Sequence, residues 1–322
     1  MAKKLRAERF RKGSIVFDKL EMKFHLDENG NPMGVFFKKM KDANLLIEDF
    51  MLLANKSVAE FCSPKSHASS ESATQNSTGE KSAPFVYRVH DKPDEEKLKA
   101  FAEIASRFGY KINLKNAITV AETINKTLKE CAGKPESSMI EILAVRTMAK
   151  AIYTTKNIGH YGLGFAHYTH FTSPIRRYPD VMVHRLLAQK LDTHAPANKY
   201  NIQTLEGQCK HSSQREKMAA DAERASTKYK QVQFMKGRVG EEFLGTISGV
   251  TEWGVFVEII ENRCEGLIRI KDLRDDQYII DEKNYCLIGR KSKRKLSLGD
   301  KIKIEVLSAD MVKKQLNFAL AE

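Results

Sequence analysis

Several features that would direct a first interpretation are scarce in this 322-residue sequence. No stretch approaches the roughly 18 uninterrupted apolar residues that a membrane-spanning helix needs. The basic first residues, MAKKLRAERFRK, lack the apolar run of a secretory signal. The five cysteines are widely spread and include no Cys-x-x-Cys pair, which argues against a zinc or redox motif of that type. We therefore expect a soluble, cytoplasmic protein with reduced thiols and no membrane partner.

Signatures of several enzyme classes are missing as well. No glycine-rich loop matches a nucleotide-binding fingerprint, and Ser173 is followed by proline, which does not fit a nucleophile elbow. The histidines between 160 and 184 raise the alternative of a metal site, but no neighbouring cysteine or paired carboxylate completes a coordination sphere. We expect neither a small-molecule cofactor nor a metal ligand set in this chain.

Positive charge, by contrast, is abundant. The formal net charge is +13, which favours a polyanionic partner whose binding weakens as salt rises. Nucleic acid is the partner that this charge favours most, although basic chains also meet anionic membranes. With 42% hydrophobic residues, the chain has enough apolar side chains for the cores of two or three domains.

The first third of the chain mixes helix, hairpin and polar loop. The hydrophobic spacing predicts a basic helix at 1–12, a hairpin at 14–39 that turns at 29–32, and a helix at 42–61 that Asp42 caps. Residues 63–83 contain almost no apolar side chains and many serines and threonines, which is typical of a flexible surface loop.

The rest of the chain divides into a mainly helical part and a strand-rich part. A short strand at 85–89 precedes expected helices at 93–108, 115–131, 137–152, 179–192 and 201–233. After Lys236 and Gly237, five short alternating strands follow, which is typical of a small OB-type barrel. We therefore predict an α+β protein with domains at 1–235 and 236–322.

The most specific segment is HYGLGFAHYTHFTSPIRRYPDVMVHR at 160–185. Arg176 and Arg177 come directly before a helix that proline opens, so two guanidinium groups lie beside a positive helix end. The hydroxyls of Thr172 and Ser173 can add hydrogen bonds, and together these groups favour a phosphate. The alternative is that the arginines pair with Asp180 or other carboxylates and only hold the turn in place.

The sequence HFTSPIRRYPDVMVHR closely resembles the catalytic-domain signature of the ribonuclease II/R (RNB) family. The resemblance extends to LIEDFMLLANKSVAEF at 46–61, to FVYRVHDKPDEEKL at 85–98 and to the first residues. It implies the C-terminal, mainly helical part of a 3′→5′ exoribonuclease domain that hydrolyses single-stranded RNA to nucleoside 5′-monophosphates. Arg176 matches the family position that contacts the RNA backbone at the scissile phosphate.

The resemblance also suggests contacts to the substrate away from the arginines. Glu223 matches a family glutamate near the 3′ nucleotides, and Glu48 matches an acid near the substrate ribose. Either side chain could equally be a solvated charge on a helix. For His170, the alternatives are an ordinary hydrogen-bonding role or stacking beside the RNA.

The family's Mg²⁺ ligands are not found in this sequence. Family members hold the metal with a D-x₅-D-x-D-D cluster, and the single Asp-Asp pair here, Asp275-Asp276, lacks the accompanying acids. We expect a truncated catalytic domain that is inactive alone. It would be an exoribonuclease, either split and completed by a separate N-terminal half or present as a fragment, or else an RNA-binding module without hydrolysis.

The strand-rich end resembles the S1 RNA-binding domain through GTISGVTEWGVFVEI and EGLIRIKDL. Trp253 and Phe256 are candidates for stacking on bases, and Arg269 and Lys271 for contacting the phosphates of single-stranded or structured RNA. Phe243 is a further candidate, and the alternative for Phe256 is a place in the barrel core. RKSKRK at 290–295 is expected as a loop between the third and fourth strands, either a solvated charge run or, as we favour, an RNA contact.

Overall fold

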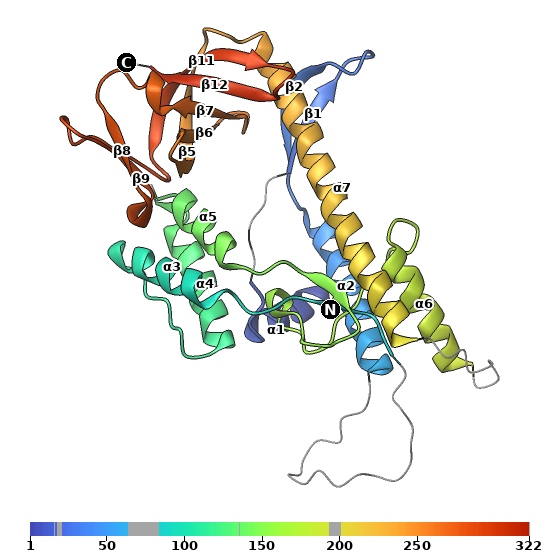
Figure 1. Ribbon diagram of the computed structural model, residues 1–322. Helices are drawn as coiled ribbons and strands as arrows, with labels where there is room; N and C mark the ends of the chain where they lie inside the picture. The colour runs from blue at the N-terminus through green and yellow to red at the C-terminus, as the bar shows by residue number, and fades with distance from the viewer. Residues whose placement is uncertain (16, 18–20, 64–83, 135, 193–200, 322) are drawn as a thin grey trace.

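The computed structural model describes residues 1–15, 17, 21–63, 84–134, 136–192 and 201–321. Helices and a small sheet form one part, and a β-barrel forms the other (Figure 1). The long helix α7 (Ile202–Lys236) runs from the helical part to the barrel. The predicted mixture of helices and strands is confirmed. Apart from Ser63, the predicted loop at 63–83 lies outside the described residues.

The N-terminal residues form two packed helices and a hairpin. Helix α1 (Ala2–Arg11) packs against α2 (Asp42–Cys62), and Arg6 forms an ion pair of 2.7 Å with the buried Asp49. Between them, β1 (Glu21–Leu26) and β2 (Pro32–Lys38) form an antiparallel hairpin. The prediction that Asp42 caps α2 is wrong. Lys41 precedes the helix, and its backbone N–H donates to the Asn44 side chain.

Three helices and a two-stranded sheet follow. Strand β3 (Tyr87–Val89) pairs with β4 (Ile152–Thr154), and α3 (Glu95–Arg107), α4 (Ala117–Cys131) and α5 (Ser137–Thr147) pack around Phe101, Ile124 and Ile140. The predicted helix at 137–152 is too long. It ends at Thr147 because Met148 turns to an extended backbone, and the β-branched and aromatic residues 152–154 then pair with β3.

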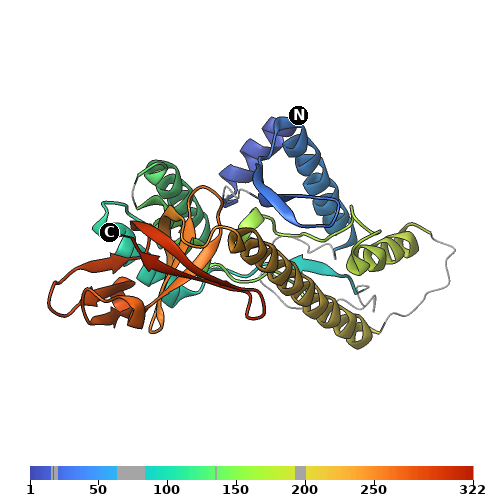
Figure 2. The ribbon, with the colours of Figure 1, turned by 90° about the horizontal axis from the view of Figure 1, so that it is seen from above.

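Helices α6 (Tyr178–Leu191) and α7 complete this part of the molecule, and Figure 2 shows them from above. Helix α7 extends three residues beyond the predicted end at 233. Its last turns remain helical because Val232 and Met235 are fully buried in the barrel core. The helix thereby ties the barrel to the helical part.

The C-terminal part is the predicted five-stranded barrel. Strands β5 (Glu242–Thr251), β6 (Gly254–Ile259), β7 (Glu265–Arg269), β11 (Lys301–Asp310) and β12 (Gln315–Leu320) close in the order β11-β12-β7-β6-β5. Alternate side chains fill the interior, among them Ile247, Val257 and Phe318.

A second, smaller sheet was not predicted. Strands β8 (Tyr278–Asp281), β9 (Cys286–Gly289) and β10 (Lys295–Ser297) pair in the order β10-β9-β8. RKSKRK therefore connects two strands of this sheet and is not a simple loop between the third and fourth barrel strands. Strands of three or four residues are too short for their alternation to stand out in the sequence.

Candidate functional site

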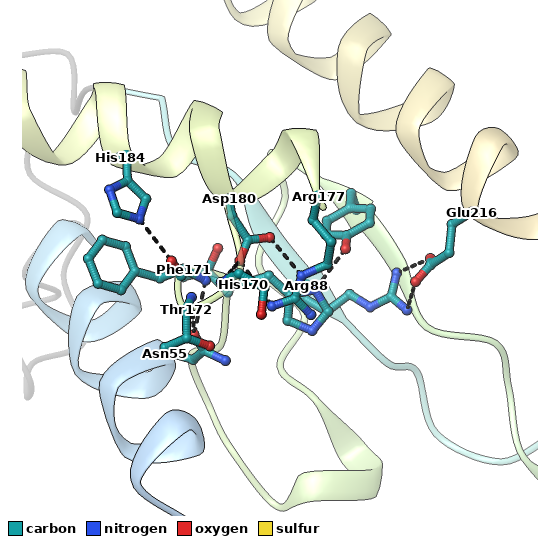
Figure 3. A network of polar contacts seen from close by, with 12 residues as sticks. Asn55, Arg88, His170, Phe171, Thr172, Arg177, Asp180, His184 and Glu216 are labelled. Carbon is teal, nitrogen blue, oxygen red and sulfur yellow. Dashed lines mark hydrogen bonds and ion pairs between the residues drawn. The ribbon is translucent and has the colours of Figure 1, made fainter. Parts of the chain in front are cut away.

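The loop that carries Arg176 and Arg177 is held by the buried side-chain amide of Asn55. Asn55 of α2 is 3% exposed, and its Oδ1 accepts hydrogen bonds from the backbone N–H groups of Phe171 (2.9 Å) and Thr172 (3.2 Å). Its Nδ2 donates to the Tyr168 hydroxyl at 3.0 Å. Asn55 lies beside Phe171 and Thr172 in Figure 3. Asn55 was not among the residues predicted from the sequence. The available signal was a polar residue on the same helix stripe as the buried Ala59 and Cys62.

Helix α6 holds the same loop from the other side. Asp180 is fully buried and accepts from the Ser173 N–H at 2.7 Å and from Arg177 Nη2 at 2.9 Å. His184 Nε2 lies 2.8 Å from the Phe171 carbonyl oxygen, and the two rings stack with centroids 4.1 Å apart. Side chains from two helices therefore fix the backbone of residues 171–173.

These contacts change the anion site expected at the start of α6. The helix begins at Tyr178, with Pro179 in its first turn, but the Asp180 carboxylate already occupies the backbone N–H of Ser173. Arg177 Nε also lies 2.9 Å from Asp180 Oδ2, so the arginine is neutralised by its own helix. The alternative in which Arg177 pairs with Asp180 and holds the turn matches this geometry. A contact of Arg177 with RNA remains a prediction.

Arg176 differs from its neighbour. Its side chain is exposed, and among the residues that the structure describes it forms no hydrogen bond or ion pair. Ile175 beside it is 102% exposed. The Thr172 hydroxyl is buried without a hydrogen-bond partner in the described chain, and Ser173 is half-buried. The loop thus presents the exposed Arg176 guanidinium group, while the Thr172 hydroxyl is buried and unsatisfied within the described chain.

A second layer of side chains lies behind the loop. The Tyr153 hydroxyl is 2.7 Å from His170 Nδ1, and the Arg88 guanidinium stacks over the Tyr153 ring at 4.6 Å. Arg88 in turn donates twice to Glu216 of α7, at 2.6 and 2.9 Å (Figure 3). This chain of contacts joins the loop to α7. His170 thus has an ordinary hydrogen-bonding partner in Tyr153, and stacking of His170 beside RNA stays a prediction.

Burial determines the protonation of the histidines near this layer. Burial, followed by the positive charges of Arg177 and Arg88, lowers the pKa of His170 to about 2. Burial and the neighbouring His90 ring, whose centroid is 5.1 Å away, lower the pKa of His160 to about 3. Both rings are therefore neutral near pH 7. Among the described residues, no group of three or more His, Cys, Asp or Glu side chains is arranged to hold a metal ion.

The shifted pKa of His170 predicts a loss of stability in acid. The unfolded chain binds a proton below the ordinary histidine pKa of about 6.5, whereas folded His170 does not, so the free energy of unfolding decreases as pH falls. Between pH 6.5 and pH 5.5 this decrease amounts to about 1 kcal/mol for one histidine. Urea unfolding of the protein and of His170→Gln at both pH values tests this, and equal pH dependence of the two would contradict it.

The two acidic candidates lie on other elements. Glu48 of α2 is half-exposed at 3.8 Å from Arg9, seven residues before Asn55 on the same helix. Glu223 is exposed on α7. The hydrogen bond and charge of Glu21, followed by the charge of Glu223, raise the pKa of Lys23 of β1. No described contact joins either glutamate to Arg176, so their roles toward RNA remain predictions.

The four barrel candidates lie together on one side of the barrel. Trp253 is 70% exposed in the turn between β5 and β6, and its carbonyl accepts from the Ile270 N–H at 2.9 Å. Phe256 is half-buried on the outer face of β6, opposite Leu267, so it is not part of the barrel core. Arg269 lies opposite Gly254, and the exposed Lys271 follows. Phe243 instead packs against the barrel core.

The edge of this outer face depends on a glycine. Gly254 has φ +147°, and a Cβ there would lie 2.0 Å from the Ile268 carbonyl oxygen. Glycine thus allows β6 to approach β7 beside Arg269, whose Nη2 donates to Asn317 Oδ1 at 3.0 Å. An aromatic ring, an oriented guanidinium group and an amide therefore share one surface, which is the composition of a single-strand nucleic-acid site.

Comparison with protein families agrees with this division of the chain. The RNB domain matches residues 1–193, and the S1 RNA binding domain matches residues 236–320. No helix among the described residues is long and apolar enough to cross a membrane.

Known proteins resemble the chain over nearly its whole length. It is 38% identical to Ribonuclease R of Aquifex aeolicus over 318 residues, which are 99% of this chain and 43% of that relative. The apo form of Mycoplasma genitalium RNase R superposes with a TM-score of 0.86 at 28% identity, covering 99% of this chain and 48% of that one. The same protein in complex with ribose methylated single-stranded RNA gives 0.85 at 27% identity, with the same coverage. The chain thus spans less than half the length of these proteins.

Proposed function

Because the chain belongs to the RNB family, with relatives named Ribonuclease R, we propose that it forms the RNA-guiding part of a 3′→5′ exoribonuclease. The substrate would be single-stranded RNA, or structured RNA as it opens, hydrolysed to nucleoside 5′-monophosphates. In this proposal the helical part holds the scissile end, and the barrel holds RNA further along the strand. The RNA complex of the Mycoplasma protein supports the choice of polymer.

The observation that carries the proposal is the difference between the two adjacent arginines. Arg177 is neutralised by the buried Asp180. Arg176 is exposed and has no side-chain partner among the described residues, on a loop that Asn55 and Asp180 hold in place. A guanidinium group fixed in this way can donate two parallel hydrogen bonds to a phosphate with little reorganisation. We assign Arg176 the contact with the scissile phosphate and Arg177 the role of a positioning residue.

The described residues do not fit the Mg²⁺ that hydrolysis in this family would use. They contain no suitable group of carboxylates, and the sequence has no D-x₅-D-x-D-D cluster. Asp276 belongs to the single Asp-Asp pair of the sequence. Its carboxylate already accepts hydrogen bonds from the backbone N–H groups of Lys291 and Ser292. In this proposal the metal ligands are carboxylates supplied from outside these 322 residues.

An exonuclease assay on labelled single-stranded RNA with Mg²⁺ tests the proposal. We expect no shortening of the RNA by the chain alone and stepwise shortening after a polypeptide with the aspartate cluster is added. Decay by the pure chain would overturn the need for a second part. Binding without decay in both samples would favour the other candidate function, an RNA-binding module without hydrolysis.

That second candidate has one observation in its favour. The outer face with Trp253, Phe256 and Arg269 is complete within this chain. Trp253→Ala should weaken RNA binding by about tenfold, because stacking contributes roughly 1–3 kcal/mol per base. Its unfolding free energy should stay unchanged, because the ring is mostly exposed. The matched control is Phe108→Ala, which removes an aromatic ring exposed by 46% at the end of α3. Equal binding by both variants would remove Trp253 from the site.

A further inference from the structure

The sheet β8-β9-β10 ends in a turn with an unusual concentration of positive charge. Residues 290–295, which we call the basic turn, read RKSKRK, and all six are exposed. Only Arg294 has an ion-pair partner among the described residues, the Asp275 carboxylate at 3.0 Å. Arg290, Lys291, Lys293 and Lys295 have none. Four unpaired cations close together repel one another, which is costly unless a polyanion covers them.

This turn is held in one conformation by a carboxylate. Asp276 accepts from the backbone N–H of Lys291 (2.9 Å), from the N–H of Ser292 (2.6 Å) and from the Ser292 hydroxyl (2.7 Å). The Ser292 hydrogen bonds hold the pKa of Asp276 well below its usual range. Lys293 adopts a left-handed backbone with φ 56°, which completes the tight turn. The cations are thus displayed by a fixed scaffold and not by a loose loop.

The basic turn lies close to the outer face of the barrel. The carbonyl oxygen of Trp253 accepts a hydrogen bond from the Ile270 N–H. After Ile270 the chain continues through Lys271 and the exposed Arg274 to Asp276. Asp276 lies five positions after Lys271, so their Cα atoms are at most about 18 Å apart. Figure 1 shows β8 and β9 on the side of the barrel away from α7. Lys271 and Arg274 therefore lie between the aromatic face and the turn, interspersed with Asp272 and with Asp275, which pairs with Arg294.

We propose that the basic turn is a second RNA-binding element, which contacts the phosphates of the strand as it leaves the barrel face. The inference deepens the proposed function, because it needs RNA on the barrel. Its ligand is the phosphate backbone and not the bases, since the turn offers only cationic side chains and Ser292. Binding there should therefore be independent of sequence and strongly dependent on salt.

A second turn of the barrel provides a matched control. The turn at 311–314 joins β11 to β12, and it also carries two adjacent cations, Lys313 and Lys314. Asp310 accepts from its backbone N–H groups, and Lys314 has a left-handed φ of 53°. Strand β12 runs parallel to β7, so this turn lies beyond the N-terminal end of β7. Trp253 and Lys271 lie at the C-terminal end of β7.

The test compares Lys291→Gln/Lys293→Gln with Lys313→Gln/Lys314→Gln in the full chain. Each pair of substitutions removes two positive charges, and in each pair one of the lysines has a left-handed backbone conformation. With labelled polyuridylate and polyadenylate, the first pair should weaken binding of both about tenfold and reduce the slope of log affinity against log salt by about 1.4. The second pair should change affinity less than twofold. Equal losses from both pairs, or no loss from either, would overturn the proposal.

A further variant distinguishes the effect of the arrangement of the cations from the effect of the protein's net charge. Asp276→Ala removes the scaffold of the turn but makes the protein more positive by one charge. If the arrangement of the cations matters, affinity falls. If only the total charge matters, affinity rises and the proposal fails. If the wild-type chain binds no RNA at all, the proposed function itself is contradicted. If Lys291→Gln/Lys293→Gln binds RNA normally while Trp253→Ala binds it weakly, the basic turn alone is excluded from the RNA-binding surface.

Discussion

Replacing Arg176 by alanine should lower the exonuclease rate of the complemented enzyme by about two to three orders of magnitude. The side chain is exposed and unpaired within the described chain, on a loop fixed by Asn55 and Asp180. Such a group stabilises the negative charge that develops on the phosphate and needs little reorganisation to do so. The measurement is the single-turnover rate of shortening of a labelled RNA at saturating enzyme.

The control for this prediction is Arg185→Ala. Arg185 is likewise exposed, on α6, and lies two turns beyond the loop. It should retain the wild-type rate within about twofold. Arg176→Lys should recover only part of the activity, because an ammonium group keeps the charge but not the two parallel donors. Equal rates for the Arg176 and Arg185 alanine variants would refute the assignment.

Asp180→Ala should reduce the free energy of unfolding of the helical part by about 3–5 kcal/mol. The carboxylate is fully buried, forms an ion pair with Arg177 and accepts a hydrogen bond from the backbone N–H of Ser173. Its removal leaves a largely buried cation and an N–H group without partners, which is more costly than the loss of an exposed pair. Urea unfolding followed by circular dichroism measures the change in midpoint.

A surface pair with the same spacing serves as the comparison. Asp221 and Arg224 of α7 also lie three residues apart, but both side chains are more than half exposed. Asp221→Ala should therefore cost less than about 1 kcal/mol. In the site, Arg177→Ala combined with Asp180→Ala should be less destabilising than the sum of the single changes, because the two residues interact directly. Additive effects would show that the pair contributes nothing to the loop.

Much of the architecture could be predicted from local patterns. The alternation of apolar residues after Lys236 predicted the five barrel strands, and helical spacing predicted six of the helices within a few residues. The long helix at 201–233 was predicted too short because its last turns depend on contacts with the barrel. The short strands of the β8-β9-β10 sheet carry too few residues for a pattern to develop.

The candidate site shows the same limit more sharply. The motif TSPIRRYPD identified the segment, and its resemblance to the RNB family assigned Arg176 to the scissile phosphate, which stays a prediction. The motif did not show how the arginines are held. Asn55 lies 116 residues before Phe171, and Glu216 lies 128 residues after Arg88. Contacts between such distant positions leave no periodic trace along the chain.

The sequence by itself therefore determined the family, the order of the elements and the excess of positive charge, because each of these is encoded in neighbouring residues. The tertiary structure decided which charges remain available. It buries Asp180 against Arg177 and leaves Arg176 free, and it turns RKSKRK into a fixed group of cations on Asp276. A charged side chain stays available for RNA only if folding brings no partner within hydrogen-bonding distance of it. Which groups come that close depends on the packing of the whole chain.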